Sequence, residues 1–391
     1  MTVGTLVLLA ASSATRAAEE ALEVKGNRIQ VYGVLRLDAI YTDSAVNNRQ
    51  VTFWANSEDP RTGAAVNKND DGFNMHPRLT RFGVNVSRPD IPAISGASLD
   101  GKMEFDFQNG GTESRQAVRL RHGFLRVSRG DWKILAGQTA DLISPLLPST
   151  NHDAPGWNYG NLGDRRPQLR VSYQPLLLGD VRLQAEVAAV RTGAIDAKDL
   201  DADGDLDGDD SGLPMLQARA GIASLWERRI DVGLWGHRGR EETSTRIANL
   251  SDSHFVTDSL GFDLTFRLPW KSTLLMEGWR GQDLADLRGG VGQNVNATTA
   301  REIRSEGGWL EIRHKTTDRL STFTGAGLDN PRDRDLNDAN RTRNQALWLG
   351  GAYDLGGGLS VGGDWTSWRT EYRYREEGTA NRIGLYAAYQ F

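Results

Sequence analysis

The chain has no cysteine among its 391 residues, so no disulfide can stabilise it. Beyond the N-terminal segment, no apolar run approaches the ~18 residues that a membrane-spanning helix needs. The formal net charge of −5 gives no sign of a nucleic-acid partner. These absences exclude a disulfide scaffold and a protein anchored by helices. They leave a chain that must be held together by hydrogen bonding and packing.

Lysine is scarce as well. Only seven of the 46 basic residues are lysine, so 39 are arginine. The planar guanidinium fork suits carboxylates and phosphates better than an ammonium group does. The bias therefore favours anion recognition, although a genome rich in arginine codons would produce the same composition.

The N-terminus has the pattern of a secretory signal peptide. An apolar run covers residues 3–11, and the small residues Ala14, Ala17 and Ala18 follow it. No positive charge precedes Arg16, which departs from the usual pattern. We expect residues 1–18 to be removed and residues 19–391 to form one β-barrel domain.

The last ten residues alternate strictly between two kinds of side chain. The apolar or aromatic set is Ile383, Leu385, Ala387, Tyr389 and Phe391, and the residues between them are polar or small. This alternation indicates a strand with one apolar face and one polar face. A strand that ends on an aromatic residue is typical of the closing strand of a bacterial outer-membrane barrel, with Phe391 and Tyr389 as the assembly signal. An edge strand of a soluble all-β domain is the alternative.

Similar alternating stretches recur about sixteen times along the chain, with polar or glycine-rich joints between them. This spacing predicts an all-β fold, a transmembrane antiparallel β-barrel of about 16 strands. The mean hydropathy of −0.50 does not argue against it, because only half of each strand faces lipid. Backbone groups in hydrocarbon must pair internally, so the stretch at 28–41 should pair with the stretch at 379–391.

The polar faces of these stretches would line a lumen. At residues 115–124, for example, Val118, Leu120 and Phe124 should face lipid, and Arg119 and Arg121 should face inward. Charged side chains in a narrow aqueous pore set ion selectivity, but they can equally form cross-strand ladders that stiffen the wall. The basic residues expected to line the pore and bind solute are Arg36, Arg81, Arg119, Arg121, Arg165, Arg166 and Arg170.

The connection at residues 140–167 is rich in proline and ends in the pair Arg165–Arg166. General porins fold a loop inward at this place to form their constriction. An inward loop and an ordinary extracellular loop are both compatible with the sequence.

An acidic segment at residues 201–210 places Asp201, Asp203, Asp205 and Asp207 at every second position. This spacing resembles the start of a calcium loop. Counted from Asp201, the twelfth position is Gly212 in place of the glutamate that an EF-hand needs. A solvated acidic loop is therefore the preferred interpretation, and a Ca²⁺ site is the alternative.

No enzymatic pattern stands out. The sequence GLSVG at residues 358–362 matches GxSxG but lies inside an alternating stretch, where the required strand–turn–helix elbow cannot form. The six histidines lack ligand spacing. A sugar channel with inward Trp235 and Trp279, a barrel enzyme, and a plugged structural barrel remain alternatives. Most other tryptophans are expected in the aromatic girdles at the membrane surfaces.

Four segments carry a family resemblance: VYGVLRLDAIY at 31–41, PRLTRFG at 77–83, RLRHGF at 119–124 and LAGQT at 135–139. In order and spacing they resemble the DcaP-like porin family. The resemblance implies a homotrimer of 16-stranded barrels in the outer membrane of a bacterial cell, inserted by the outer-membrane assembly machinery and surrounded by its lipid. It also implies passive transport of small anionic solutes, dicarboxylates among them, past Arg36, Arg81, Arg119 and Arg121. No cofactor and no enzymatic activity are expected.

Overall fold

The computed structural model describes residues 21–59, 70–108, 117–151, 154–244 and 253–391. The predicted signal peptide at 1–18 lies outside these residues. Over the described ranges the chain is almost entirely β, and no helix there is long and apolar enough to cross a membrane.

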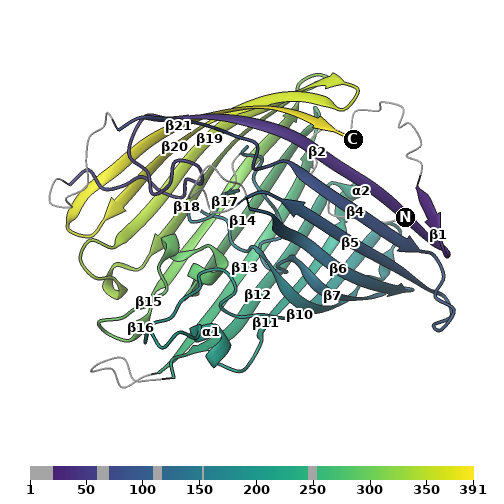
Figure 1. Cartoon of the computed structure of the whole chain (residues 1–391), viewed down its shortest axis with the longest axis horizontal. Coiled ribbons are helices and arrows are strands. Elements are labelled where there is room, and N and C mark those ends of the chain that lie inside the picture. Colours follow the sequence, from purple (N-terminus) through teal and green to yellow (C-terminus); the bar gives the residue numbers. More distant parts are fainter. Residues whose placement is uncertain (1–20, 60–69, 109–116, 152–153, 245–252) are drawn as a thin grey trace.

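One antiparallel sheet closes on itself as a barrel (Figure 1). Within the described residues it contains 19 strand segments, of which 16 form the wall. In chain order the wall strands are β2 (Asn27–Thr42), β4 (Arg81–Arg88), β5 (Ala97–Asp106), β6 (Arg119–Arg129), β7 (Trp132–Ala140), β8 (Arg165–Tyr173), β10 (Val181–Val190), β11 (Met215–Ser224), β12 (Ile230–Glu242), β13 (His254–Leu268), β14 (Ser272–Gln282), β17 (Arg304–Lys315), β18 (Leu320–Pro331), β19 (Arg341–Gly356), β20 (Leu359–Tyr372) and β21 (Arg375–Gln390). The predicted fold class and strand number are confirmed.

Short elements extend or decorate this wall. Three short strands pair with wall strands: β1 (Leu22–Val24) and β3 (Gly72–His76) with β2, and β9 (Leu176–Leu178) with β10. The connections hold a small hairpin and single helical turns, namely β15 (Val295–Asn296), β16 (Arg301–Glu302), α1 (Asp207–Asp210), α2 (Leu225–Arg228), η2 (Ala285–Leu287), η3 (Gly290–Gly292) and η4 (Asp333–Asp335).

Closure joins the first and last wall strands, as predicted. β2 pairs with β21 from Val34 opposite Gln390 to Thr42 opposite Arg382. Figure 1 shows β21 in yellow beside β2 in purple. Because the strands run antiparallel, short turns and long connections alternate between the two ends of the barrel.

The two faces of the wall follow the alternation read from the sequence. On β2 the exposed outer residues are Val31, Leu35, Leu37 and Tyr41, while Asp38 between them is buried inside. On β21 Ile383 and Leu385 are likewise exposed. An outward apolar belt on a closed sheet is the surface that a lipid bilayer requires.

One face assignment is wrong. The pairing of β5 with β6 shifts between Glu104 and Phe105, so that Arg121 is an extra residue on β6. A bulge of one residue moves every later side chain to the other face. Phe124 therefore lies opposite Lys102 on the lumenal side, and Leu125 takes the exposed outer position.

Candidate functional site: a lumen narrowed by an inward loop

The connection between β7 and β8 folds into the barrel. Its backbone N–H groups are bound by carboxylates from three strands of the wall: Leu146 donates to Glu277 on β14 at 2.8 Å, Ser149 to Glu311 on β17 at 2.9 Å, and Asn151 to Asp364 on β20 at 3.0 Å. We call residues 141–164 the constriction loop; of these, 152 and 153 lie outside the described residues. Of the two paths that the sequence left open for residues 140–167, the structure has the inward one.

Tryptophans on the same side of the wall complete this attachment. The indole N–H of Trp279 donates to the Gly160 carbonyl at 2.7 Å, and those of Trp309 and Trp348 donate to Glu277 and Glu311 at 3.0 and 2.8 Å. Tyr159 at the centre of the loop is fully buried. The loop is therefore a fixed part of the inner wall along β11 to β20.

The tryptophan distribution differs from the expectation. Trp235 and Trp279 do point inward, but only 2% and 6% of their surfaces are exposed. The buried tryptophans are Trp157, Trp235, Trp279, Trp309, Trp348 and Trp368, so fewer stand in girdles than predicted. Alternation identifies the inward face of a strand, yet it cannot reveal that a loop will cover that face.

Basic side chains gather on the other side of the lumen, on β4, β5, β6 and β8. Arg121 donates to Glu104 and to Asp106, each at 2.7 Å. Arg119 also donates to Asp106 at 2.7 Å, but about a third of its side chain remains exposed. These bidentate contacts orient the guanidinium groups and leave Arg119 accessible from the lumen.

Two further arginines lie within electrostatic reach of Arg121. Arg165 pairs with Asp164 at 3.5 Å, and Arg81 has an Nε that lacks a hydrogen-bond partner within the described residues. Burial raises the pKa of Asp164, but the charges of Arg288 and Arg165 outweigh this effect and hold that pKa below its ordinary value. The Asp164 carboxylate therefore keeps its negative charge.

We define the basic patch as Arg81, Lys102, Arg119, Arg121 and Arg165. Within the described residues, the carboxylates that pair with its members are Glu104, Asp106 and Asp164. Five cations face three anions, so the patch has an excess of positive charge. Part of it is a charge ladder that stiffens the wall, and Arg119 remains partly exposed.

Arg36 lies on the neighbouring strand β2 and is bound on two sides. Its Nε donates to Asp38 at 3.0 Å, and its guanidinium stacks on the ring of Tyr386 at 4.1 Å from the centroid. The side chain is 16% exposed, so a small part of it reaches the lumen.

Arg382 on β21 is a lumenal residue that sequence reasoning did not select. It is 2% exposed, and its Nε and one terminal nitrogen lack hydrogen-bond partners among the described residues. His76 and Asp364 lie within electrostatic reach of it. The sequence does contain a signal for it, because alternation places Arg382 on the inward, polar face of the last strand.

Arg166 does not line the pore, which corrects a prediction. The side chain is completely buried and forms ion pairs with Asp141 at 2.9 Å and Asp286 at 2.6 Å. It joins the start of the constriction loop to the η2 turn. Arg170, by contrast, donates to Gln168 and to the Ala140 carbonyl on the inner face of β8 and is only partly buried.

Neither Ser360 nor His237 has the neighbours of a catalytic nucleophile and its base. Ser360 lies on β20, which continues as a strand to Tyr372, so the nucleophile elbow is missing at this place. His237 contacts Ser259 at 2.6 Å, but its other ring nitrogen meets Thr257 at 2.9 Å where a triad would need a carboxylate.

A closed wall of 16 strands with a loop folded into its lumen is the architecture of bacterial outer-membrane channels. Among solved structures, the chain is similar to the outer membrane channel DcaP of Acinetobacter baumannii, with a TM-score of 0.75 at 19% identity, over 95% of this chain and 99% of that chain. This match agrees, at the level of the fold, with the resemblance drawn from the four motifs.

More distant barrels match as well. The anion-selective porin from Comamonas acidovorans matches with a TM-score of 0.59 at 10% identity, over 93% of this chain and 100% of that chain. OmpF of Salmonella typhi matches with a TM-score of 0.60 at 9% identity, over 94% and 98%. No protein-family model and no curated protein sequence matches the chain.

Proposed function

We propose that the protein is an outer-membrane porin, a passive diffusion channel for small solutes that prefers anions such as dicarboxylates. The observation that carries the proposal is the unequal charge of the two sides of the lumen. The carboxylates Glu277, Glu311 and Asp364 are occupied by the amides of the constriction loop, whereas the basic patch has more cations than carboxylates.

The mechanism needs no cofactor. As an anion passes, the exposed part of Arg119 and the edges of Arg36 and Arg81 replace some of its hydration water. The guanidinium groups of Arg119 and Arg36 are already engaged by Asp106 and Asp38, which weakens their hold on the solute. A solute that is bound weakly at several points can enter and also leave, and a dicarboxylate can contact two of these arginines in turn.

We also propose a homotrimer in the outer membrane. One neighbour with the same fold, OmpT of Vibrio cholerae, is described in a trimer form, at 13% identity. Phe391 and Tyr389 are the residues that we expect the assembly machinery to recognise. Chemical cross-linking of the purified protein in detergent tests the trimer. A trimer should give bands of one, two and three chains on denaturing gels.

The experiment that tests the transport proposal is the reversal potential of the full-length protein in a planar bilayer under a KCl gradient. An anion-selective potential supports the proposal, and the double variant Arg119→Gln/Arg121→Gln should shift it toward cations. Arg228→Gln, which removes an exposed ion pair at the barrel rim, is the matched control and should leave the potential unchanged.

Other results would point to the alternatives. Cation selectivity in the unmodified protein would contradict the anion preference, and a barrel that does not conduct would favour a plugged structural protein. A sugar channel is less favoured, because Trp235 and Trp279 lie beneath the constriction loop and present little aromatic surface to a solute.

A further inference from the structure

The long connection between β10 and β11 contains an acidic loop. Its aspartates can be aligned with a calcium-loop template in two ways, starting from Asp201 or from Asp199. An EF-hand calcium loop takes side-chain ligands from positions 1, 3 and 5, often a water-mediated ligand at position 9 and a glutamate at position 12, with glycine at position 6. Counted from Asp199, the first of them, this window ends at Asp210. It places Asp201, Asp203, Gly204, Asp207 and Asp210 at positions 3, 5, 6, 9 and 12.

The register that begins at Asp199 fits this template better than the one that begins at Asp201. The register from Asp201 leaves Gly212 at the last ligand position, whereas the register from Asp199 has a carboxylate there. The glycine at position 6 makes the sharp turn of such loops, and Gly204 has a φ of +101°, which favours glycine over residues with a Cβ.

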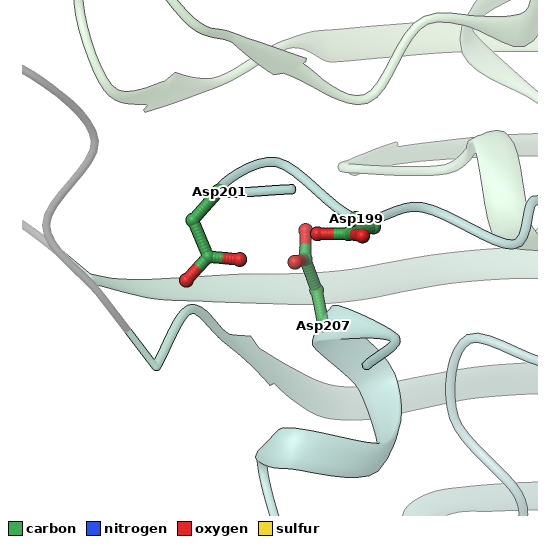
Figure 2. A group of neighbouring side chains, drawn as sticks. All are labelled: Asp199, Asp201 and Asp207. Atoms are coloured by element: carbon green, nitrogen blue, oxygen red, sulfur yellow. The ribbon is translucent and has the colours of Figure 1, made fainter. Parts of the chain in front are cut away.

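The fold brings three of these side chains together. Asp199, Asp201 and Asp207 each offer a carboxylate oxygen, and the three oxygens lie within 4.8 Å of one another (Figure 2). Figure 2 shows Asp199 and Asp201 on the loop and Asp207 rising toward them from the start of α1. Asp203 and Asp205, which the first register includes, are exposed and lie outside the group.

Asp207 gives an independent reason to expect a cation. Its side chain is fully buried, and its Oδ1 accepts the Leu200 N–H at 3.1 Å. Its Oδ2 has no hydrogen-bond partner within the described residues. A buried carboxylate oxygen without a partner is costly, and more so when two other carboxylates face it.

The nearest side-chain cation does not remove that cost. Lys198 Nζ is 3.8 Å from Asp207 Oδ2, beyond hydrogen-bonding distance, and donates to Glu241 at 2.7 Å. Lys198 Nζ also lies 3.7 Å from the Oδ1 atom of Asp283. Lys198 is thus shared among three carboxylates, while oxygens of Asp199 and Asp201 lie within 4.8 Å of Asp207.

We propose that Asp199, Asp201 and Asp207 bind a calcium ion in this external loop. Oxygen ligands at this spacing suit a hard divalent cation, and the ion would offset the repulsion among the three carboxylates. Asp203 and Asp210 occupy the other acidic positions of the template. Asp210 accepts a hydrogen bond from Ser244 at 3.1 Å and would have to turn to reach the ion.

Binding would also stiffen the outer mouth of the barrel. The start of the same connection is held by Asp286, whose carboxylate accepts the N–H groups of Gly193 at 3.0 Å and Ile195 at 2.8 Å. Asp286 also pairs with Arg166, at the root of the constriction loop. An ion in the acidic loop would therefore add a further attachment to a segment whose start is already fixed.

Calorimetric titration of the full-length protein with CaCl₂ tests the site, using protein refolded without bacterial lipid so that lipid phosphates bind no calcium. We expect one ion per chain. Asp207→Asn and Asp199→Asn should each weaken binding at least tenfold. Asp209→Asn, which removes an exposed pair with Arg191 at a position without a ligand role, should bind calcium normally.

The proposal is wrong if the unmodified protein takes up no calcium, or if Asp209→Asn loses binding to the same extent as Asp207→Asn. Circular dichroism and gel mobility establish that each variant is folded. If Asp207→Asn does not fold, Asp201→Asn decides the question, because Asp201 is only partly buried. The titration is independent of pore selectivity, so its outcome does not bear on the proposed transport function.

Discussion

Gly33 and Phe391 exchange both of their backbone hydrogen bonds, with N···O distances of 3.0 and 3.1 Å. The aromatic ring covers the glycine so closely that a Cβ at position 33 would lie 2.4 Å from the ring carbon Cζ. Phe391 is therefore a partner of the first wall strand, and the barrel seam extends to this residue.

Deletion of Phe391 should lower the yield of folded protein severalfold, because it removes both hydrogen bonds and uncovers Gly33. Gly33→Val should have a similar effect by displacing the ring. Gly101→Ala is the control, since a Cβ there meets its nearest atom at an ordinary 3.6 Å. Yield is measured by heat-modifiable gel mobility after refolding. Normal yield for both seam variants would show that closure does not depend on this contact.

Removal of the carboxylates that hold the constriction loop should widen the pore. In Glu277→Leu/Glu311→Leu, the loop amides at Leu146 and Ser149 lose acceptors, at a cost of about 1–3 kcal/mol for each buried group. We expect higher and noisier single-channel conductance. Glu186→Leu, which removes a wall carboxylate that bonds Gln174 outside the loop, should keep the original conductance. Equal conductance in all three proteins would mean that other contacts suffice to hold the loop.

Substitution of Arg166 should lower the stability of the folded protein and leave the ion selectivity of the channel unchanged. Arg166→Leu leaves Asp141 and Asp286 as buried charges without their partner, which costs about 3–5 kcal/mol. Arg228→Leu breaks a surface pair with Asp180 and should cost at most about 1 kcal/mol. Urea unfolding in detergent measures the difference. An altered reversal potential in a folded Arg166→Leu protein would show that Arg166 contributes to ion selectivity.

The bulge at Arg121 can be tested with cysteine probes, for which a chain without cysteine is well suited. Phe124→Cys should react with a membrane-impermeant thiol reagent from the lumen, and Leu125→Cys should be protected by lipid. The opposite pattern would restore uninterrupted alternation along β6. Leu120→Cys precedes the bulge and should be protected in either case.

Arg382 should contribute to anion passage although it is almost fully buried. Its unpartnered nitrogens lie near Asp364 and His76, so that loss of its charge leaves Asp364 less compensated. Arg382→Gln should shift the reversal potential toward cations. Arg369→Gln removes an exposed pair with Glu377 and serves as the control. Identical potentials for the two variants would assign Arg382 a purely structural role.

Alternation was sufficient to predict the barrel, because each residue on a strand has only two directions in which to point. It places Leu385 and Arg382 on opposite faces and predicts that the first and last wall strands, β2 and β21, pair. It failed at Arg121, since a bulge adds one residue without a distinctive sequence signal.

The role of each arginine was harder to predict than the direction in which its side chain points. Arg119 and Arg166 both point inward, yet one is a third exposed and the other is fully buried. The difference depends on the path of the constriction loop, which is fixed by contacts more than 100 residues away in the chain, such as that between Ser149 and Glu311. Local patterns carry no record of such contacts.

The constriction loop has a consequence for how selectivity could change among related channels. The whole chain is acidic, with a net charge of −5, so a basic passage depends on hiding carboxylates as much as on adding arginines. Glu277, Glu311 and Asp364 are hidden by backbone amides, which every residue except proline supplies. If the channel prefers anions as proposed, one proline or deletion in the loop would shift the selectivity toward cations while every charged side chain of the wall stays the same.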